Sequence, residues 1–203
     1  MQLLIDTDAF IKLGISGLFN DTLDLLNIDL NECGRLPALT YMLRKGSVPR
    51  LFGVDLCNKL IPLAESIPVL DQPRDSWLDK LKDVHDIDPG EAQIIAVAAE
   101  SRLLVITGDK RALLALKSIA NVATVLAGRI ITIEAILILM CDQFGQEYVR
   151  ERVRVISSFD TMIEVCFSTG NPEPREALLS YYQNLVVEVD PLILWNPSLI
   201  GEA

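Results

Sequence analysis

The chain has 203 residues, of which 50% are hydrophobic and 23% charged, and its formal net charge is −10. This composition favours a packed core over disorder, and the negative charge argues against broad binding to nucleic acid through phosphate neutralisation. A nuclease is still possible, because a bound divalent cation supplies positive charge locally.

The first part of the chain is predicted to form two strands and five helices. We expect strands at 2–5 and 66–71, and helices at 8–17, 20–26, 36–46, 54–64 and 76–83. The helix at 36–46 carries Pro37 in its first turn and Gly46 as its stop signal, the usual positions of these residues.

The clearest helix is predicted at 88–101. Asp88 can be its N-cap, Pro89 fits the first helical position and Glu91 the third, which together predict a capping box. A strand at 103–106, a helix at 109–118, a strand at 121–126 and a helix at 132–144 follow. Short apolar strands alternating with helices of about ten residues predict an α/β fold with a central parallel sheet flanked by helices.

This alternation stops after Gly145. Helices are expected at 146–168 and 173–188, so we divide the chain into a domain at 1–145 and a helical C-terminal extension at 146–203. The segment 189–199 has two prolines and an apolar patch around Trp195, and we expect it to dock on the body of the protein or on a partner.

Acidic residues follow two of the predicted strands. Asp6 and Asp8 come directly after the first strand, and Asp109 follows the strand at 103–106. Ligands of open parallel sheets bind outside the carboxyl ends of the strands, where these carboxylates could meet around one hard cation, usually Mg²⁺ or Mn²⁺. Glu91 opens the helix that leads into the second of these strands, so it joins the candidate set. Each acid also has a plain interpretation as a helix cap.

Basic residues could complete such a site. The amides at the start of the helix after Asp109 would point at the same edge, where Lys110 and Arg111 are candidate contacts to a substrate phosphate. Lys12, Arg44 and Lys45 could extend this basic rim, although scattered solvated charges are the alternative interpretation of all five cations.

Four segments together resemble the PIN domain, the nuclease-like fold of many type II toxins. They are LLIDTDAFI (3–11), DPGEAQIIAVAAE (88–100), LLVITGDKRALLAL (103–116) and AGRIITIEAIL (127–137), in the order and at the spacing of that family. The resemblance implies a three-layer domain with a parallel sheet and an acidic pocket for Mg²⁺ or Mn²⁺. It also implies cleavage of single-stranded RNA by a metal-activated water.

Residue by residue, Asp6, Glu91 and Asp109 match the first, third and fourth acids of the family as metal ligands and catalytic residues. Thr107 matches the small hydroxyl residue that often precedes the last acid by two positions. The second acid normally lies on the helix at 36–46, which has no carboxylate here; Tyr41 or Met42 stands near that position. Asp8 or Glu32 could supply the missing ligand. The long helical tail also departs from the minimal toxin pattern.

Three alternatives stay open. The missing acid favours a catalytically degenerate PIN-like module that only binds partners. Asp6-Thr7-Asp8 also fits the opening of a haloacid-dehalogenase-like phosphohydrolase, although Leu113 stands where that family usually has a further acid. The chain could also be the toxin of a toxin–antitoxin pair, in which case an antitoxin protein would shield the pocket.

The remaining composition excludes other chemistry. The four cysteines form no Cys-x-x-Cys pair, and His85 is the only histidine, so we expect neither a zinc site nor a disulfide framework. The longest apolar stretch, 130–141, is shorter than the ~20 residues of a membrane span, and acids appear too early for a signal peptide. We therefore expect a cytoplasmic protein whose excess apolar surface is covered by its extension or in a homo-oligomer.

Overall fold

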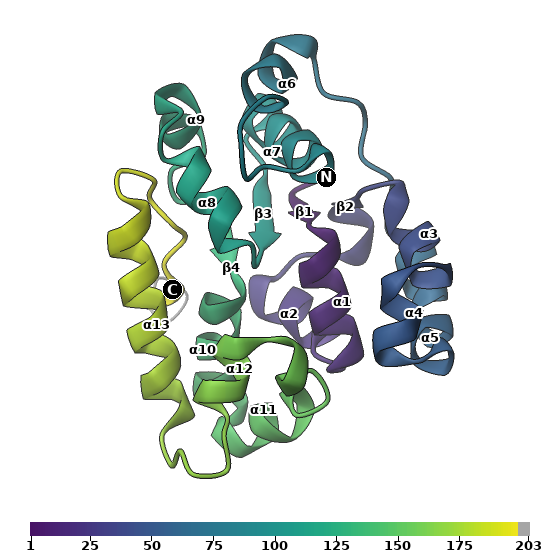
Figure 1. Cartoon of the computed structure of the whole chain (residues 1–203), viewed down its shortest axis with the longest axis vertical. Coiled ribbons are helices and arrows are strands. Elements are labelled where there is room, and N and C mark those ends of the chain that lie inside the picture. The colour runs from purple at the N-terminus through teal and green to yellow at the C-terminus, as the bar shows by residue number, and fades with distance from the viewer. Residues whose placement is uncertain (199–203) are drawn as a thin grey trace.

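A four-stranded parallel sheet forms the centre of the protein (Figure 1). The computed structural model describes residues 1–198, except for the side chains of Asp75 and Ala120. The strands are β1 (Leu3–Ile5), β2 (Cys33–Arg35), β3 (Leu104–Thr107) and β4 (Ile130–Thr132), in the spatial order β2-β1-β3-β4. Each neighbouring pair is parallel, so the predicted α/β class with a parallel sheet is confirmed.

The strands are buried on both faces. All three residues of β1, β2 and β4 are buried, and so are three of the four residues of β3. Because successive side chains of a strand point to opposite faces, helices must cover both sides of the sheet. This burial explains why β1, β3 and β4 appear in the sequence as apolar runs rather than as an alternating pattern.

Within residues 1–145, whose backbone the structure describes throughout, ten helices accompany the strands. They are α1 (Thr7–Ile15), α2 (Phe19–Leu26), α3 (Ala38–Arg44), α4 (Ser47–Phe52), α5 (Val54–Ser66), α6 (Asp75–Leu81), α7 (Pro89–Ser101), α8 (Lys110–Leu116), α9 (Ala120–Val125) and α10 (Ile133–Phe144), with a 3-10 turn η1 at Leu30–Glu32. Most lie where the sequence predicts them. None of the helices described in the chain is both long and apolar enough to cross a membrane.

The predicted strand at 121–126 is wrong, because this segment forms α9. Val122 and Leu126, four residues apart, are both fully buried, which is the spacing of one helix face. The strand lies later, at β4, where Ile130 and Ile131 pair with Val105 and Ile106 of β3. The pairing partner, rather than the local pattern, selects this segment as the edge strand.

The predicted strand at 66–71 is also wrong. Only Val69 forms a bridge to the sheet, opposite Arg35, and α5 already occupies the segment as far as Ser66. Pro68 has no N–H group to donate to a ladder, which limits the pairing to this single bridge. The real edge strand on this side, β2, has the sequence Cys-Gly-Arg and carries no apolar run that would have predicted it.

Arg35 secures this edge from inside the protein. Its side chain is buried, and its guanidinium donates hydrogen bonds to the backbone carbonyls of Ala64, Ile67 and Leu36. We expect Arg35→Leu to lower the free energy of unfolding by about 3 kcal/mol, because the buried carbonyls lose a charged donor. Urea denaturation measures this loss. Arg129→Leu, which removes an exposed donor to one carbonyl, is the control and should cost less than about 1 kcal/mol.

Residues 146–198 are helical in the structure. They form α11 (Gln146–Val153), the 3-10 turn η2 (Ser157–Phe159), α12 (Thr161–Cys166) and α13 (Pro174–Val189). The single helix predicted at 146–168 is wrong, because the side chain of Asp160 accepts from the Ile163 amide and starts a new helix. Figure 1 shows α13 running along α10, against which it packs. Residues 199–203 of the predicted extension lie outside the described residues.

The segment after α13 docks on the body of the protein. The Trp195 amide donates to the Ile130 carbonyl of β4 at 2.9 Å, and the Gly128 amide donates to the Ile193 carbonyl at 2.8 Å. The Tyr182 hydroxyl donates to the Trp195 carbonyl at 2.7 Å. The bond from Trp195 pairs a backbone carbonyl on the outer edge of β4, and the other two bonds hold the segment beside that edge, which would otherwise present unpaired backbone groups.

Candidate functional site

The order of the strands fixes where a ligand can bind. The chain goes from β1 to β2 on one side and then crosses to β3 on the other side of β1. Ligands of open α/β sheets bind at such a switch point, outside the carboxyl ends of the two strands. Asp6 directly follows β1 and its amide donates to the Ile106 carbonyl of β3 at 3.0 Å, whereas Asp109 lies two residues beyond β3.

A pocket of about 310 Å³ opens at this edge. It is lined by five acids, Asp6, Asp8, Asp88, Glu91 and Asp109. The three predicted ligands and Asp8 therefore come together, and Asp88 joins them. The walls are mostly apolar and come from α3 and α4 on one side and from the C-terminal extension on the other. They include Met42, Val48, Leu51, Phe52, Ile156 and Phe159.

The predicted capping box at the start of α7 is present. Asp88 Oδ1 accepts from the Glu91 amide, and Glu91 Oε2 accepts from the Asp88 amide, both at 2.8 Å. Sequence reasoning gave Asp88 only this capping role and missed its place on the pocket. The D-P-G-E spacing was the available signal, because a capping box holds both carboxylates at the same helix end.

Asp109 is the N-cap of α8. Its Oδ1 accepts from the amides of Arg111 and Ala112, and its Oδ2 pairs with the Arg111 guanidinium at 3.2 Å. Burial raises the pKa of Asp109, but these hydrogen bonds outweigh it and leave the pKa below its usual value. The predicted phosphate site at the amides of this helix is therefore occupied by the protein's own carboxylate. Thr107 accepts from the Asp109 amide at 3.2 Å and supports the turn.

Asp6 and Glu91 have strongly raised pKa values. Burial raises the pKa of Asp6 to about 7, with a further contribution from the nearby Asp8, against a hydrogen bond from the Thr7 amide. Burial also raises the pKa of Glu91 to about 7, helped by Asp109, Asp88 and Asp6 and opposed by the bond from the Asp88 amide. A site that withholds solvent from clustered carboxylates in this way favours a bound cation or proton.

Lys12 lines the pocket, as expected of a rim cation, but both of its partners are carboxylates of the protein itself. Its Nζ pairs with Asp8 Oδ2 and with Asp160 Oδ2, both at 2.7 Å, and its side chain is only 15% exposed. Burial lowers the pKa of Lys12, but the two carboxylates more than offset this and hold it above its usual value. A Cβ at Gly108 would lie 3.7 Å from both Asp8 and Lys12, which places the ion pair next to the end of β3.

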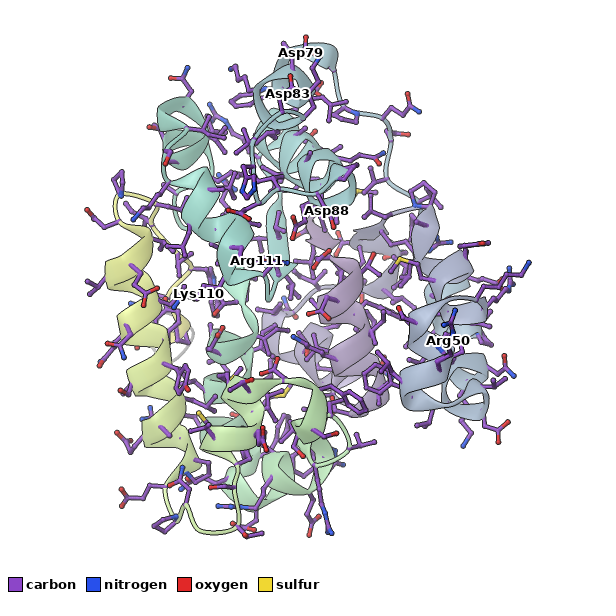
Figure 2. The ribbon with its side chains drawn as sticks, viewed as in Figure 1. Arg50, Asp79, Asp83, Asp88, Lys110 and Arg111 are labelled. Carbon is purple, nitrogen blue, oxygen red and sulfur yellow. The ribbon has the colours of Figure 1, made fainter. Side chains whose placement is uncertain are left out.

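The other expected rim cations also have partners. Lys110 pairs with Glu188 of α13 at 2.5 Å, Arg111 with Asp109, and Arg44 with Glu65, while Lys45 lies over the Tyr41 ring. Figure 2 places Asp88 at the start of α7, Lys110 and Arg111 at the start of α8, and Arg50 on α4. Lys110 and Arg111 are exposed, so both can still exchange their partners for a ligand.

Glu32 does not supply the missing acid. It precedes β2, at the amino end of the sheet, where it accepts from the Gln2 side chain at 2.6 Å. The pocket lies at the opposite, carboxyl end. Asp8 does line the pocket, but it pairs with Lys12, and Met42 occupies the wall formed by α3.

Glu134 is a further acid that sequence reasoning missed. It follows β4 by two residues and lines an adjacent pocket together with Lys12 and Asp160. Burial raises the pKa of Glu134. Because the strand was predicted at 121–126, Glu134 was not recognised as an acid that follows a strand. Asp6 and Asp109 were recognised because they follow strands, at the edge of the sheet where ligands bind.

The donor set is chemically suited to Mg²⁺ or Mn²⁺, since it consists of carboxylate oxygens. The Thr7 amide donates to one oxygen of the Asp6 carboxylate. The Asp88 amide likewise donates to one oxygen of the Glu91 carboxylate. Over residues 1–198, however, no three Asp, Glu, His or Cys side chains stand close enough to ligate one ion. A cation would have to draw Asp6, Glu91 and Asp109 closer together and displace Arg111 from Asp109.

Comparison with known proteins gives no match to a family model, to a curated protein or to a solved structure. The PIN-like resemblance therefore stays a prediction. The acidic pocket is the feature of this structure that bears on function, because a fold class alone does not define an activity.

Proposed function

We propose that this protein is a ribonuclease of the PIN type that depends on Mg²⁺ or Mn²⁺ and hydrolyses phosphodiester bonds in single-stranded RNA. The observation that carries the proposal is the meeting of Asp6, Glu91 and Asp109 in one pocket at the switch point of the sheet. Residues 1–145 form the PIN-like domain in this proposal, and the helical extension supplies one wall of the pocket.

Asp6, Glu91 and Asp109 would hold the cation. When bound, it would lower the pKa of a water and stabilise the charge that develops on the phosphate oxygens. Asp109 is kept ionised by its hydrogen bonds, so it would bind a cation without releasing a proton once Arg111 is displaced. Asp6 and Glu91, with pKa values of about 7, would release protons as the cation binds.

Lys12 would act by holding Asp8 and the extension in place, since both of its contacts are internal carboxylates. The proposed partners are single-stranded RNA as substrate and a second copy of the chain. An antitoxin that shields the acidic pocket is a further candidate, because the pocket walls offer apolar side chains to a bound peptide.

Calorimetric titration with Mn²⁺ tests the metal site. We expect the wild-type chain to bind Mn²⁺ and Asp109→Asn to lose at least tenfold in affinity, because a ligand charge is removed with little change of shape. Glu32→Gln, which neutralises an acid at the opposite end of the sheet, is the matched control and should bind as the wild type does. Proton release, measured in buffers of different ionisation enthalpy, should accompany binding at pH 7.

Cleavage of a labelled single-stranded RNA in Mn²⁺ tests the activity. Loss of cleavage in both Asp6→Asn and Asp109→Asn, with folding intact, would support the proposal. A folded wild-type chain that binds no Mn²⁺ would contradict it and favour the degenerate interaction module. Mn²⁺ binding without cleavage of RNA would point to the same module with a retained metal site.

A further inference from the structure

Two aromatic rings meet at the wall of the acidic pocket. Phe52, the last residue of α4, and Phe159, the last residue of η2, both line it. Their ring centroids are 4.6 Å apart and their planes are tilted by 60°. The contact therefore joins two walls of the pocket, one from the sheet domain and one from the C-terminal extension.

Phe159 lies at the surface, whereas Phe52 is half-buried and packs against the hydrophobic core. Phe159 is 44% exposed, and the neighbouring wall residue Leu51 is 54% exposed. Large apolar side chains exposed beside a polar floor are characteristic of ligand sites, where a few polar groups orient a ligand that apolar walls hold. A volume of about 310 Å³ reaches the lower end of the roughly 300–1,000 Å³ typical of such sites.

The residue that follows Phe159 is held by two contacts. This residue, Asp160, accepts from the Ile163 amide at 3.1 Å and pairs with Lys12 at 2.7 Å. Lys12 in turn pairs with Asp8, which lines the pocket. The position of the Phe159 ring is thus linked to the pocket floor by two ion pairs.

The charges at this site limit how it can bind RNA. Five carboxylates line the pocket, and Lys12, Lys110 and Arg111 already pair with acids. Even if Lys110 and Arg111 exchange their partners for phosphates, the five carboxylates outnumber these three cations, so phosphate neutralisation, the usual source of affinity for nucleic acid, is weak here. Stacking of bases on aromatic rings needs no cation and works with every base.

We propose that Phe52 and Phe159 form a base-binding clamp for single-stranded RNA. An unpaired base stacks against the Phe159 ring, with the tilted Phe52 ring as its support, and the adjoining phosphodiester lies over Asp6, Glu91 and Asp109. The clamp rests on the proposed function, because it assigns the base contact of that same site. It gives the C-terminal extension a role in substrate binding.

Fluorescence anisotropy with a labelled oligoadenylate tests the clamp. We compare variants in the Asp109→Asn background, which is expected to leave the RNA uncut and removes one negative charge from the pocket. We expect Phe159→Ala to weaken binding by about 5- to 150-fold, the range measured for loss of one stacked base. Phe159→Trp should restore binding because it keeps an aromatic face. Phe144→Ala is the matched control, since Phe144 is 39% exposed and contacts only Tyr148 among the aromatic pairs of the described residues.

An oligonucleotide that lacks bases separates stacking from lost packing. It should bind weakly to the parent chain and lose no further affinity in Phe159→Ala. If Phe159→Ala loses affinity equally for oligoadenylate and for the oligonucleotide without bases, the clamp is overturned. Unchanged RNA binding in Phe159→Ala would also overturn the clamp. In either case the nuclease proposal would still stand if the chain with Asp109 intact cleaved RNA. Failure of that chain to cleave, together with failure of the Asp109→Asn chain to bind RNA, would overturn both. Binding without cleavage would keep the clamp and reject the nuclease.

Discussion

Asp6→Asn is expected to stabilise the folded chain by about 2–4 kcal/mol at pH 8 in the absence of divalent cations. The reason is that Asp6 is buried, with a pKa raised from 3.8 to about 7. At pH 8 the native state must hold this carboxylate ionised, close to Asp8 and away from water. Asparagine keeps the shape and the acceptor for the Thr7 amide without the charge.

The pH dependence follows from the direction of the shift. Between about pH 4 and pH 7 the native state retains a proton on Asp6 that the unfolded chain has already lost. Stability therefore falls as the pH rises through this window, and Glu91 contributes in the same direction between about 4.5 and 7. Asp6→Asn should flatten the decline.

Thermal denaturation in EDTA from pH 4 to pH 8 measures this effect. Asp83→Asn, at an exposed acid outside the pocket, is the control and should follow the wild-type profile. Saturating Mn²⁺ should restore the stability of the wild type above pH 7 and leave Asp6→Asn unchanged. Wild-type and Asp6→Asn profiles that run parallel from pH 4 to pH 8 would rule out a raised pKa at Asp6.

Lys12→Met is expected to lower the free energy of unfolding by about 3–5 kcal/mol. Removal of this cation leaves Asp160, whose side chain is 13% exposed, with an uncompensated negative charge next to Glu134. Because Asp160 also starts α12, we expect the turn η2 and α12 to loosen first. Hydrogen exchange should therefore show faster exchange at the Ile163 and Phe167 amides than in the wild type.

A double-mutant cycle separates the ion pair from lost packing. Asp160→Asn should cost less in the Lys12→Met background than in the wild type, since the repulsion it relieves exists only there. Lys82→Met is the matched control, because the exposed pair of Lys82 with Asp79 should contribute no more than about 1 kcal/mol. Equal costs of Lys12→Met and Lys82→Met would show that the buried pair does not hold the extension.

Features that depend only on neighbouring residues could be predicted from the sequence. The capping box of Asp88 and Glu91 closes within four residues, so the start of α7 could be predicted to the residue. Asp6 and Asp109 follow apolar strands directly, and parallel strands place their carboxyl ends at one edge. Their meeting at one pocket thus followed from β1 and β3 alone.

Features that depend on distant partners could not be predicted in this way, because they form only when the chain folds. The segment that becomes β4 is chosen by its pairing with β3, so the local pattern at 121–126 misled the prediction and concealed Glu134. Nothing near Lys12 in the sequence indicates Asp160, and nothing near Phe52 indicates Phe159. Packing of the extension across the pocket brings these pairs together, because burial and opposite charge act between surfaces and not along the chain.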